Sequence, residues 1–296
     1  MTASGFLLFD KPAGRTSFSA IGGFRKTFPG SRVGHTGTLD SFATGLLLVV
    51  VGSYSHLTPW FTGLDKTYEA EIQFGLGTDT LDPNGTVTSR GEIPSRTALE
   101  EALPAFRGRI SQTPPEYSAV HVEGKRASDL ARKGRPVELP SRQVTISRLE
   151  LLSFDGDKAV LGIDCSSGTY MRALARDLAA ACGTCAHVTA LRRSAVGIFS
   201  VLDAIPEPDN ATVQSLRLLD PETARSLGMG TGNIDEDVEK AFRNGAPYIL
   251  PSLESTLAGD GDIAVFSSRR RFLGVVESRS GRRSYKLVLP KDEYSI

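Results

Sequence analysis

The strongest hydrophobic signal in the chain is an unbroken apolar run at residues 46–51, which lies between Gly45 and Gly52. Its short length and β-branched end are typical of a strand buried on both faces, although a buried helix also fits such a run. The loop that precedes this run is therefore expected to rest on a rigid support.

A second segment, residues 68–74, alternates apolar and polar positions as a half-buried strand does. A turn signal at residues 82–85, Asp-Pro-Asn-Gly, stands between this segment and Val87. Together these patterns predict a hairpin.

Further elements follow along the chain. Residues 144–154 and 158–165 have strand patterns, and residues 95–106 read as an amphipathic helix with Ser95 as its N-cap. A second helix is indicated by an apolar stripe at Met171, Leu174, Ala175, Leu178 and Ala179. Because the elements lack regular βαβ alternation, we expect an α+β domain with a mixed, largely antiparallel central sheet and flanking helices.

The composition changes after residue 205, where a proline-rich acidic stretch at 206–210 resembles a linker or surface loop. Short strands follow at 263–266, 272–277 and 285–289, with Arg, Ser and Gly in the turns between them. This pattern predicts a second unit, a small β-rich barrel.

Charge is balanced overall, with 34 basic and 34 acidic residues, but it is segregated along the chain. Residues 206–240 hold eight acids and three bases, whereas residues 265–291 hold eight bases and one acid. Residues 124–143 form another basic segment, with six bases and two acids. Two basic surfaces separated by an acidic connector suit a polyanion bound at two places, although a single patch is more often a solvated face.

The three cysteines are too few, and odd in number, for a secreted disulfide framework. Cys182 and Cys185 form a CxxC with His187 nearby, which a redox pair or half of a zinc site would also show. Because Cys182 continues the apolar helical stripe, core packing is the preferred interpretation. The longest apolar run is far below the ~20 residues that span a bilayer, so a cytoplasmic protein without membrane association is expected.

The candidate for chemistry is Asp40, in a loop rich in glycine and threonine just before the apolar run. Gly34, Gly37 and Gly45 permit backbone angles that other residues avoid, and they allow another chain or a ligand to approach closely. Alone, an aspartate beside serine and threonine is more often a helix cap or a turn residue. The remaining motifs of the chain decide between these interpretations.

Several motifs occur in a fixed order along the chain, namely residues 10–17, the Asp40 loop and residues 66–68, 112–119, 165–172 and 191–197. In this order they resemble the TruB family of tRNA pseudouridine synthases, and the C-terminal strands resemble its PUA domain. Each piece alone is weak, but the combination is specific. The chain departs from the usual family residues at Ser41, Ser128 and Ser167.

The resemblance implies a pseudouridine synthase catalytic domain at 1–205 that contains an RNA-clamping insertion at 113–143. It further implies an acidic linker region at 206–235 and a PUA-like RNA-binding domain at 236–296. Neither a cofactor nor a metal is implied.

Asp40 matches the family's essential aspartate, which attacks C1′ of the ribose or abstracts the proton at C2′. Arg172 matches an arginine that pairs with this aspartate, and a nearby cation favours the ionised carboxylate. Lys11 and Pro12 match a motif that supports the active-site loop. A glycosidase would need a second carboxylate, which none of the matched motifs supplies.

The remaining implied site residues bind the substrate. An enzyme that acts on a base inside folded RNA must extrude it, and aromatic faces hold the extruded base. Tyr68 matches the tyrosine that stacks on this base, while Tyr170 and Leu191 match positions in the pocket wall. His35 matches a histidine that contacts the displaced nucleotides.

The implied function is the isomerisation of uridine to pseudouridine at position 55 in the T arm of tRNA, by a monomer without an obligate protein partner. Two alternatives stay open: the catalytic subunit of a guide-RNA pseudouridylation particle, and a tRNA-binding chaperone with secondary catalysis. The long insertion resembles the stand-alone form of the family. An intact set of site residues favours an enzyme over a pure binding protein.

Overall fold

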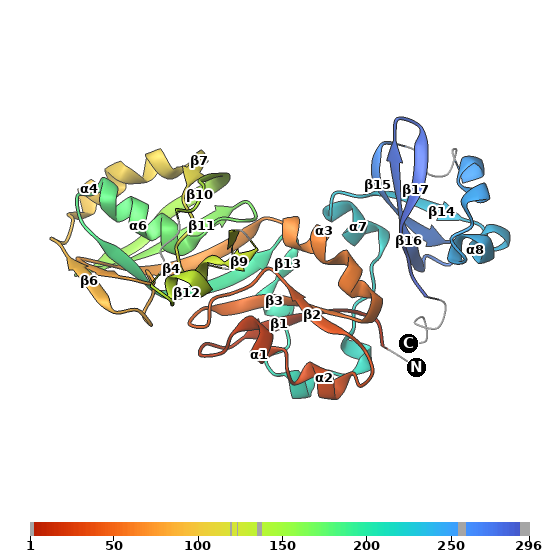
Figure 1. Ribbon diagram of the computed structural model, residues 1–296, viewed down its shortest axis with the longest axis horizontal. Coiled ribbons are helices and arrows are strands. Elements are labelled where there is room, and N and C mark those ends of the chain that lie inside the picture. Colours follow the sequence, from red (N-terminus) through yellow and green to blue (C-terminus); the bar gives the residue numbers. More distant parts are fainter. Residues whose placement is uncertain (1–2, 119, 123, 135–137, 254–258, 291–296) are drawn as a thin grey trace.

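Two β-sheets organise the molecule, a nine-stranded sheet that carries most of the chain and a four-stranded sheet formed by its C-terminal part (Figure 1). The structure is a computed structural model, and it describes residues 3–118, 120–122, 124–134, 138–253 and 259–290. Figure 1 shows the smaller sheet at one end of an elongated molecule.

The larger sheet is mixed and largely antiparallel. Its strands are β1 (Gly5–Lys11), β2 (Val33–Thr36), β3 (Thr44–Val51), β4 (Lys66–Phe74), β7 (Gly108–Gln112), β10 (Arg142–Asp155), β11 (Lys158–Cys165), β12 (Ala186–Val196) and β13 (Phe199–Ser200). They follow the order β1-β3-β12-β4-β11-β10-β7, with β2 paired to β3 and β13 to β12. β3 and β12 run parallel, and the other pairs are antiparallel. The predicted α+β class is confirmed.

The apolar run at residues 46–51 is a strand buried on both faces, as predicted. Each of its side chains is at most 1% exposed. Because successive side chains of a strand point to opposite faces, alternate residues of β3 enter two different hydrophobic cores. This strand therefore fixes the position of the loop that precedes it.

A third hydrophobic core lies between the central strands and two helices, α4 (Arg96–Ala102) and α6 (Met171–Ala181). The predicted N-cap is confirmed, because the Ser95 hydroxyl accepts a hydrogen bond from the Ala98 N–H. Cys182, just after α6, packs against this core as a half-buried residue. The strand patterns at 144–154 and 158–165 correspond to β10 and β11.

The predicted hairpin forms one strand later than expected. The turn at residues 82–85 joins β5 (Leu76–Thr78) to β6 (Val87–Arg90), and these two strands pair with each other. β4 is not part of this hairpin because β11 and β12 occupy both of its edges. The turn thereby projects from the end of the sheet toward α6.

Shorter elements complete this part of the chain. They are α1 (Ser17–Ala20), α2 (Phe24–Thr27), α3 (Thr58–Gly63), α5 (Ala127–Ala131), β8 (His121–Val122) and β9 (Lys125–Arg126). The last three lie in the predicted insertion, between β7 and β10. None of the helices in the described ranges has the length and apolar composition needed to cross a membrane.

The smaller sheet contains β14 (Gly230–Ile234), β15 (Gly261–Ser267), β16 (Phe272–Arg279) and β17 (Arg282–Val288), in that order. Helices α7 (Pro221–Ser226) and α8 (Glu236–Arg243) flank β14 in the sequence. The three predicted strands are present, in a sheet whose end strands are β14 and β17 rather than in a closed barrel. β14 pairs with β15, so the segment expected as a linker contributes a strand to this sheet.

The two sheets share a hydrophobic core that includes Phe6 and Tyr54 from the larger unit and Phe272 from the smaller one. The Tyr54 and Phe272 rings meet edge to face, with centroids 6.1 Å apart. The Trp60 indole N–H of α3 donates to Asp262 of β15 at 2.9 Å. The C-terminal sheet is thus packed against the larger unit.

Candidate active site

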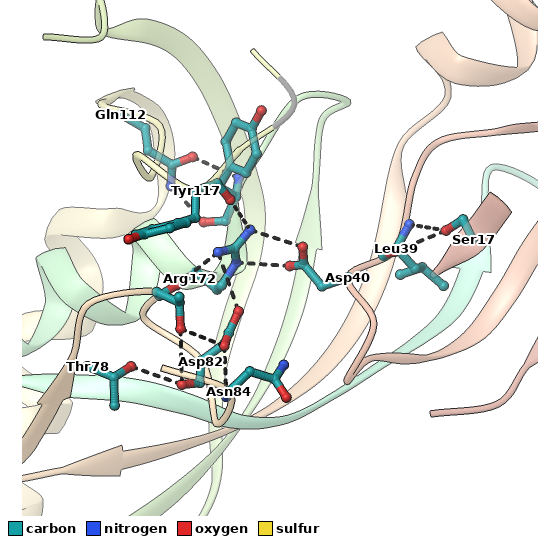
Figure 2. A network of polar contacts seen from close by, with 11 residues as sticks. Ser17, Leu39, Asp40, Thr78, Asp82, Asn84, Gln112, Tyr117 and Arg172 are labelled. Atoms are coloured by element: carbon teal, nitrogen blue, oxygen red, sulfur yellow. Dashed lines mark hydrogen bonds and ion pairs between the residues drawn. The ribbon is translucent and has the colours of Figure 1, made fainter. Parts of the chain in front are cut away.

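Asp40 lies in the loop between β2 and β3, and hydrogen bonds fix the backbone on both sides of it. On one side the Ser17 hydroxyl accepts from the Leu39 N–H at 2.9 Å and donates to the Leu39 carbonyl at 3.0 Å (Figure 2). On the other side the Ser41 carbonyl accepts from the Gly14 N–H at 2.8 Å. The aspartate is therefore presented from an anchored loop.

Lys11 lies beneath this loop at the end of β1 and is fully buried. Its ammonium donates to the carbonyls of Pro12 and Arg15, each at 2.8 Å, and to the Ser41 carbonyl at 3.5 Å. Burial lowers the pKa of Lys11 to about 8, although the charge of Asp40 opposes this shift. Lys11 thus connects the segment after β1 to the Asp40 loop, and the supporting role of Lys11 and Pro12 stays a prediction.

Arg172, in the first turn of α6, holds Asp40 through two parallel hydrogen bonds. Nε donates to one carboxylate oxygen at 2.9 Å and Nη2 to the other at 3.0 Å. Arg172 is only 4% exposed, and it also donates to the carbonyls of Thr80 at 2.8 Å and Tyr117 at 3.0 Å. Figure 2 shows its guanidinium between Asp40 and Asp82. A bidentate pair of this kind is strong and directional.

Two opposing influences set the pKa of Asp40. Burial raises the pKa of its carboxyl, and the charge of Asp82 raises it further, whereas Arg172 lowers it by charge and by hydrogen bonding. The net direction is upward from the ordinary aspartate value. About a third of the side-chain surface, 36%, stays exposed, so the carboxylate is accessible.

Gly45 of β3 allows a close contact with the backbone of β12. Its φ is +106°, and a Cβ at this position would lie 2.2 Å from the backbone oxygen of Arg193 in β12. The close neighbour expected at Gly45 is therefore another strand and not a ligand. The fully buried Arg193 guanidinium then donates to the carbonyls of Leu46 at 2.7 Å and Gly37 at 2.8 Å, which fixes the loop from the side of β12.

A cleft of about 420 Å³ opens above Asp40 and Arg172. Tyr68 of β4, Leu191 of β12 and Tyr170, just before α6, all line it. Tyr68 is 9% exposed, and burial raises the pKa of its phenol. Residues of the insertion line the cleft as well, including Ser128, one of the three departures from the family pattern.

His35 is farther from this group. It lies on β2 opposite Val49 of β3, and it is absent from the residues that line the cleft in the described structure. Its half-buried ring has Nδ1 without a hydrogen-bond partner among the described residues. Burial lowers the pKa of His35, and the charge of Arg193 lowers it further.

Several site residues were not singled out from the sequence. Gln112, 1% exposed, donates to the Tyr170 carbonyl at 3.2 Å and accepts from the Tyr170 N–H at 2.8 Å, which fixes the start of α6. Lys66 donates to the carbonyls of Thr62 and Leu64 at the end of α3, and burial lowers its pKa to about 8. Both residues begin motifs of the family resemblance, which was the available signal.

Asp82 makes a contact that was not predicted from the sequence. Its turn was expected to be only a turn, yet one of its carboxylate oxygens lies 3.5 Å from Nη1 of Arg172. The other oxygen accepts from the Thr80 hydroxyl at 2.7 Å and the Asn84 N–H at 3.0 Å. Only 10% of the Asp82 side chain is exposed, so little of its surface is left for contact with a ligand.

The arrangement can present one accessible carboxyl group, that of Asp40, to a ligand in an aromatic-lined cleft. Such a group acts as a nucleophile or as a base. Within the described ranges, no group of three or more His, Cys, Asp and Glu side chains is placed to hold a metal ion.

The fold of this chain is similar to that of a solved protein structure. The chain resembles one in a structure titled "Crystal Structure of a Cbf5-Nop10-Gar1 Complex", with a TM-score of 0.70, 20% sequence identity and coverage of 98% of this chain and 86% of that one. This likeness concerns the fold alone, and it extends over both sheets.

Sequence comparison is more specific. Residues 25–171 match the profile of the N-terminal domain of TruB family pseudouridylate synthases. The chain is 40% identical over 290 residues to tRNA pseudouridine synthase B of Caulobacter vibrioides, with 94% of each chain covered. It is 46% identical over 204 residues to the protein of the same name in Borreliella burgdorferi, which covers 68% of this chain and 72% of that one. The chain therefore belongs to the TruB family of pseudouridylate synthases.

Proposed function

We propose that this enzyme isomerises uridine 55 in the T arm of tRNA, with Asp40 as its catalytic nucleophile. The observation that carries the proposal is the bidentate Asp40–Arg172 pair at the floor of the cleft, in a chain whose relatives are named tRNA pseudouridine synthase B. Asp40 combines an ionised form favoured by Arg172 with an exposed surface that a substrate can reach.

In this proposal the uracil leaves the RNA stack and enters the cleft, where the Tyr68 ring stacks on it. Tyr170 and Leu191 close the pocket wall, and His35 contacts the displaced nucleotides. The Asp40 carboxylate attacks C1′ or removes the proton at C2′, and the N1–C1′ bond breaks. The base turns while bound, and C5 bonds to C1′. At this step the Asp40–C1′ bond breaks on the first route, or the proton returns to C2′ on the second. C5 then loses its proton, and N1 gains one. Substrate and product have the same atoms.

The C-terminal sheet supplies the second RNA contact. Arg270, between β15 and β16, and Arg282, the first residue of β17, are exposed. Some neighbours are partly neutralised, because Arg269 pairs with Glu236 at 2.8 Å and Lys286 with Asp262 at 2.8 Å. Phosphate binding at this sheet and at the insertion would hold the T arm at two places.

The proposal includes action as a monomer in the cytoplasm, without guide RNA or an obligate protein partner. The three cysteines are free, as in proteins of a reducing compartment. The alternative of a guide-RNA particle rests on a fold likeness at 20% identity, whereas 40% identity over nearly the whole chain favours the stand-alone enzyme. A protein that only binds and refolds RNA does not require the Asp40–Arg172 pair.

The test uses the purified protein and an unmodified tRNA transcript, with no guide RNA present. We expect pseudouridine at position 55, mapped by sequencing after chemical derivatisation of the modified base. A transcript with cytidine at position 55 is the matched control. Product at another uridine, or no product without added RNA or protein, would contradict the proposal.

A further inference from the structure

Arg142 uses its guanidinium differently from two other arginines that line the same cleft. Arg193 donates from Nε and Nη2 to two backbone carbonyls at 2.7 and 2.8 Å. Arg172 donates from the same two atoms to Asp40 at 2.9 and 3.0 Å. In Arg142, Nε and Nη2 are buried and have no hydrogen-bond partner within the described part of the chain.

The position of Arg142 is well defined. It is the first residue of β10 and pairs with Gln112 of β7. Its guanidinium carbon lies 4.4 Å from the centroid of the Tyr170 ring, a cation–π contact. Gln112 in turn holds the Tyr170 backbone with two hydrogen bonds. Arg142 is thus connected through Tyr170 to the start of the helix that carries Arg172.

A buried N–H of a charged group without an acceptor costs free energy, and such groups are rare in folded proteins. A guanidinium cannot escape this cost by losing its proton at ordinary pH. Its Nε–Nη2 edge matches two oxygens of one phosphate, which accept its parallel N–H bonds. The unused edge of Arg142 therefore has the geometry and the charge of an anion-binding group.

A second polar atom supports this assignment. The Ser118 hydroxyl, in the insertion, is buried and has no hydrogen-bond partner in the described ranges, and Ser118 lines the same cleft. Serine hydroxyls are common ligands of nucleic-acid phosphates. Asp40, a carboxylate of this cleft, is already neutralised by Arg172 and is no partner for Arg142.

We propose that the Arg142 side chain turns its buried Nε and Nη2 atoms toward the cleft when RNA enters, and that these atoms bind a backbone phosphate adjacent to the target uridine. The inference rests on the proposed function, because it takes the extruded nucleotide of an RNA as the occupant of the cleft. A phosphate is favoured over the edge of the base because it presents a full negative charge and two equivalent oxygens to the fork. The contact would position the RNA backbone relative to Tyr170, and so relative to Asp40.

The test measures the Kd of a T-arm stem–loop RNA in an Asp40→Asn background, which prevents turnover, with and without Arg142→Gln. We expect Arg142→Gln to weaken binding roughly ten- to a hundredfold, as for the loss of a charged hydrogen-bonded contact. The slope of log Kd against log salt should fall by about one phosphate contact. Thermal melts of each variant verify that the fold is retained.

Two modified RNAs, with a neutral methylphosphonate linkage on the 5′ or the 3′ side of the target uridine, identify the ligand. For one of them the effect of Arg142→Gln should shrink to roughly twofold or less, because the charged partner is already gone. Arg148→Gln is the matched control on the same strand, since Arg148 pairs with Asp164 at 2.7 Å away from the cleft. Its Kd should not change.

Two outcomes overturn the proposal: an unchanged Kd for Arg142→Gln, or a loss that is equally large on both neutral-linkage RNAs, which would assign Arg142 to the base. Pseudouridine formation by the parent enzyme on the unmodified stem–loop is scored separately. Its absence would contradict the proposed function, whereas the Kd series alone decides the role of Arg142.

Discussion

Asp40 and Asp82 both reach Arg172 from loops, yet the protein uses them differently. Asp40 makes two short bonds to the guanidinium, at 2.9 and 3.0 Å, and keeps 36% of its side chain exposed. Asp82 lies 3.5 Å from the same group, is 10% exposed and has one oxygen occupied by contacts within its own turn.

The difference shows how one arginine can contact two carboxylates of unequal exposure. The accessible carboxylate has lone pairs available for a ligand, whereas the enclosed one has used them to shape the turn. Asp82 also acts on Asp40 at a distance, since its negative charge raises the pKa of the Asp40 carboxyl. We therefore expect substitutions at the two positions to differ in size and in the direction of their pH effects.

Asp40→Asn should have the largest effect. The substitution keeps the shape of the side chain but removes the proposed nucleophile, so the single-turnover rate of pseudouridine formation should fall by about 10⁴-fold or more. RNA affinity should change little. Release of tritium from 5-tritiated uridine in the tRNA measures the rate. A variant that keeps a tenth of the parent rate would contradict a catalytic role for Asp40.

Arg172→Met should come next, because it removes the partner of both carboxylates. Loss of one member of a buried ion pair typically costs 3–5 kcal/mol, so the free energy of unfolding should drop by about 3 kcal/mol. Urea denaturation measures this change, and Arg172→Lys, which keeps the charge but not the fork, should lie between the variant and the parent.

The pH dependence of Arg172→Met follows from the pKa of Asp40. Burial raises this pKa and Arg172 lowers it, so removal of Arg172 should raise it further. In the proposed mechanism the active form is the ionised Asp40 carboxylate, which is lost as the pH falls through the pKa. The acidic limb of kcat/KM should therefore move to higher pH. An unmoved limb would show that Asp40 does not govern it.

Asp82→Asn should have a smaller effect, with the opposite pH shift. Removal of this negative charge lowers the pKa of Asp40, so the acidic limb of kcat/KM should move to lower pH. The rate should fall roughly tenfold because Arg172 loses one of its neighbours.

Asp79→Asn is the matched control, since Asp79 caps the N–H groups of Thr80 and Thr86 in the same turn without contacting Arg172. A shift in the same direction as that of Arg172→Met would contradict the electrostatic argument.

The same two aspartates show what could be predicted from the sequence. Asp40 was found because motifs placed it beside a buried apolar strand and paired it with Arg172. Asp82 was recognised only as a turn residue, which it is, because its turn chemistry is local. Its second contact depends on how β5 and β6 are placed against α6, and no local pattern encodes that placement.

The fold, too, was predicted only in part from the sequence. Regular alternation identified β4, β10 and β11, and the capped helix α4 was found from Ser95. β12 was not predicted as a strand, although it lies at the centre of the larger sheet between β3 and β4. It carries Arg192 and Arg193 in succession, and the burial of Arg193 depends on two carbonyl acceptors supplied by distant segments.

Ser17→Ala should produce the smallest effect and tests why Asp40 is so well placed. The substitution leaves the buried N–H and carbonyl of Leu39 without their partner, which should lower the free energy of unfolding by about 1–3 kcal/mol. Because Lys11 and Arg193 still hold the loop, the catalytic rate should fall only a few-fold, to roughly a third.

Ser19→Ala, an exposed position in the same short helix, should change the unfolding free energy by less than about 0.5 kcal/mol. Chemical denaturation and single-turnover rates measure both quantities. If Ser17→Ala lowers the rate as far as Asp82→Asn does, the anchoring of the Asp40 loop matters as much as the charge of its neighbour.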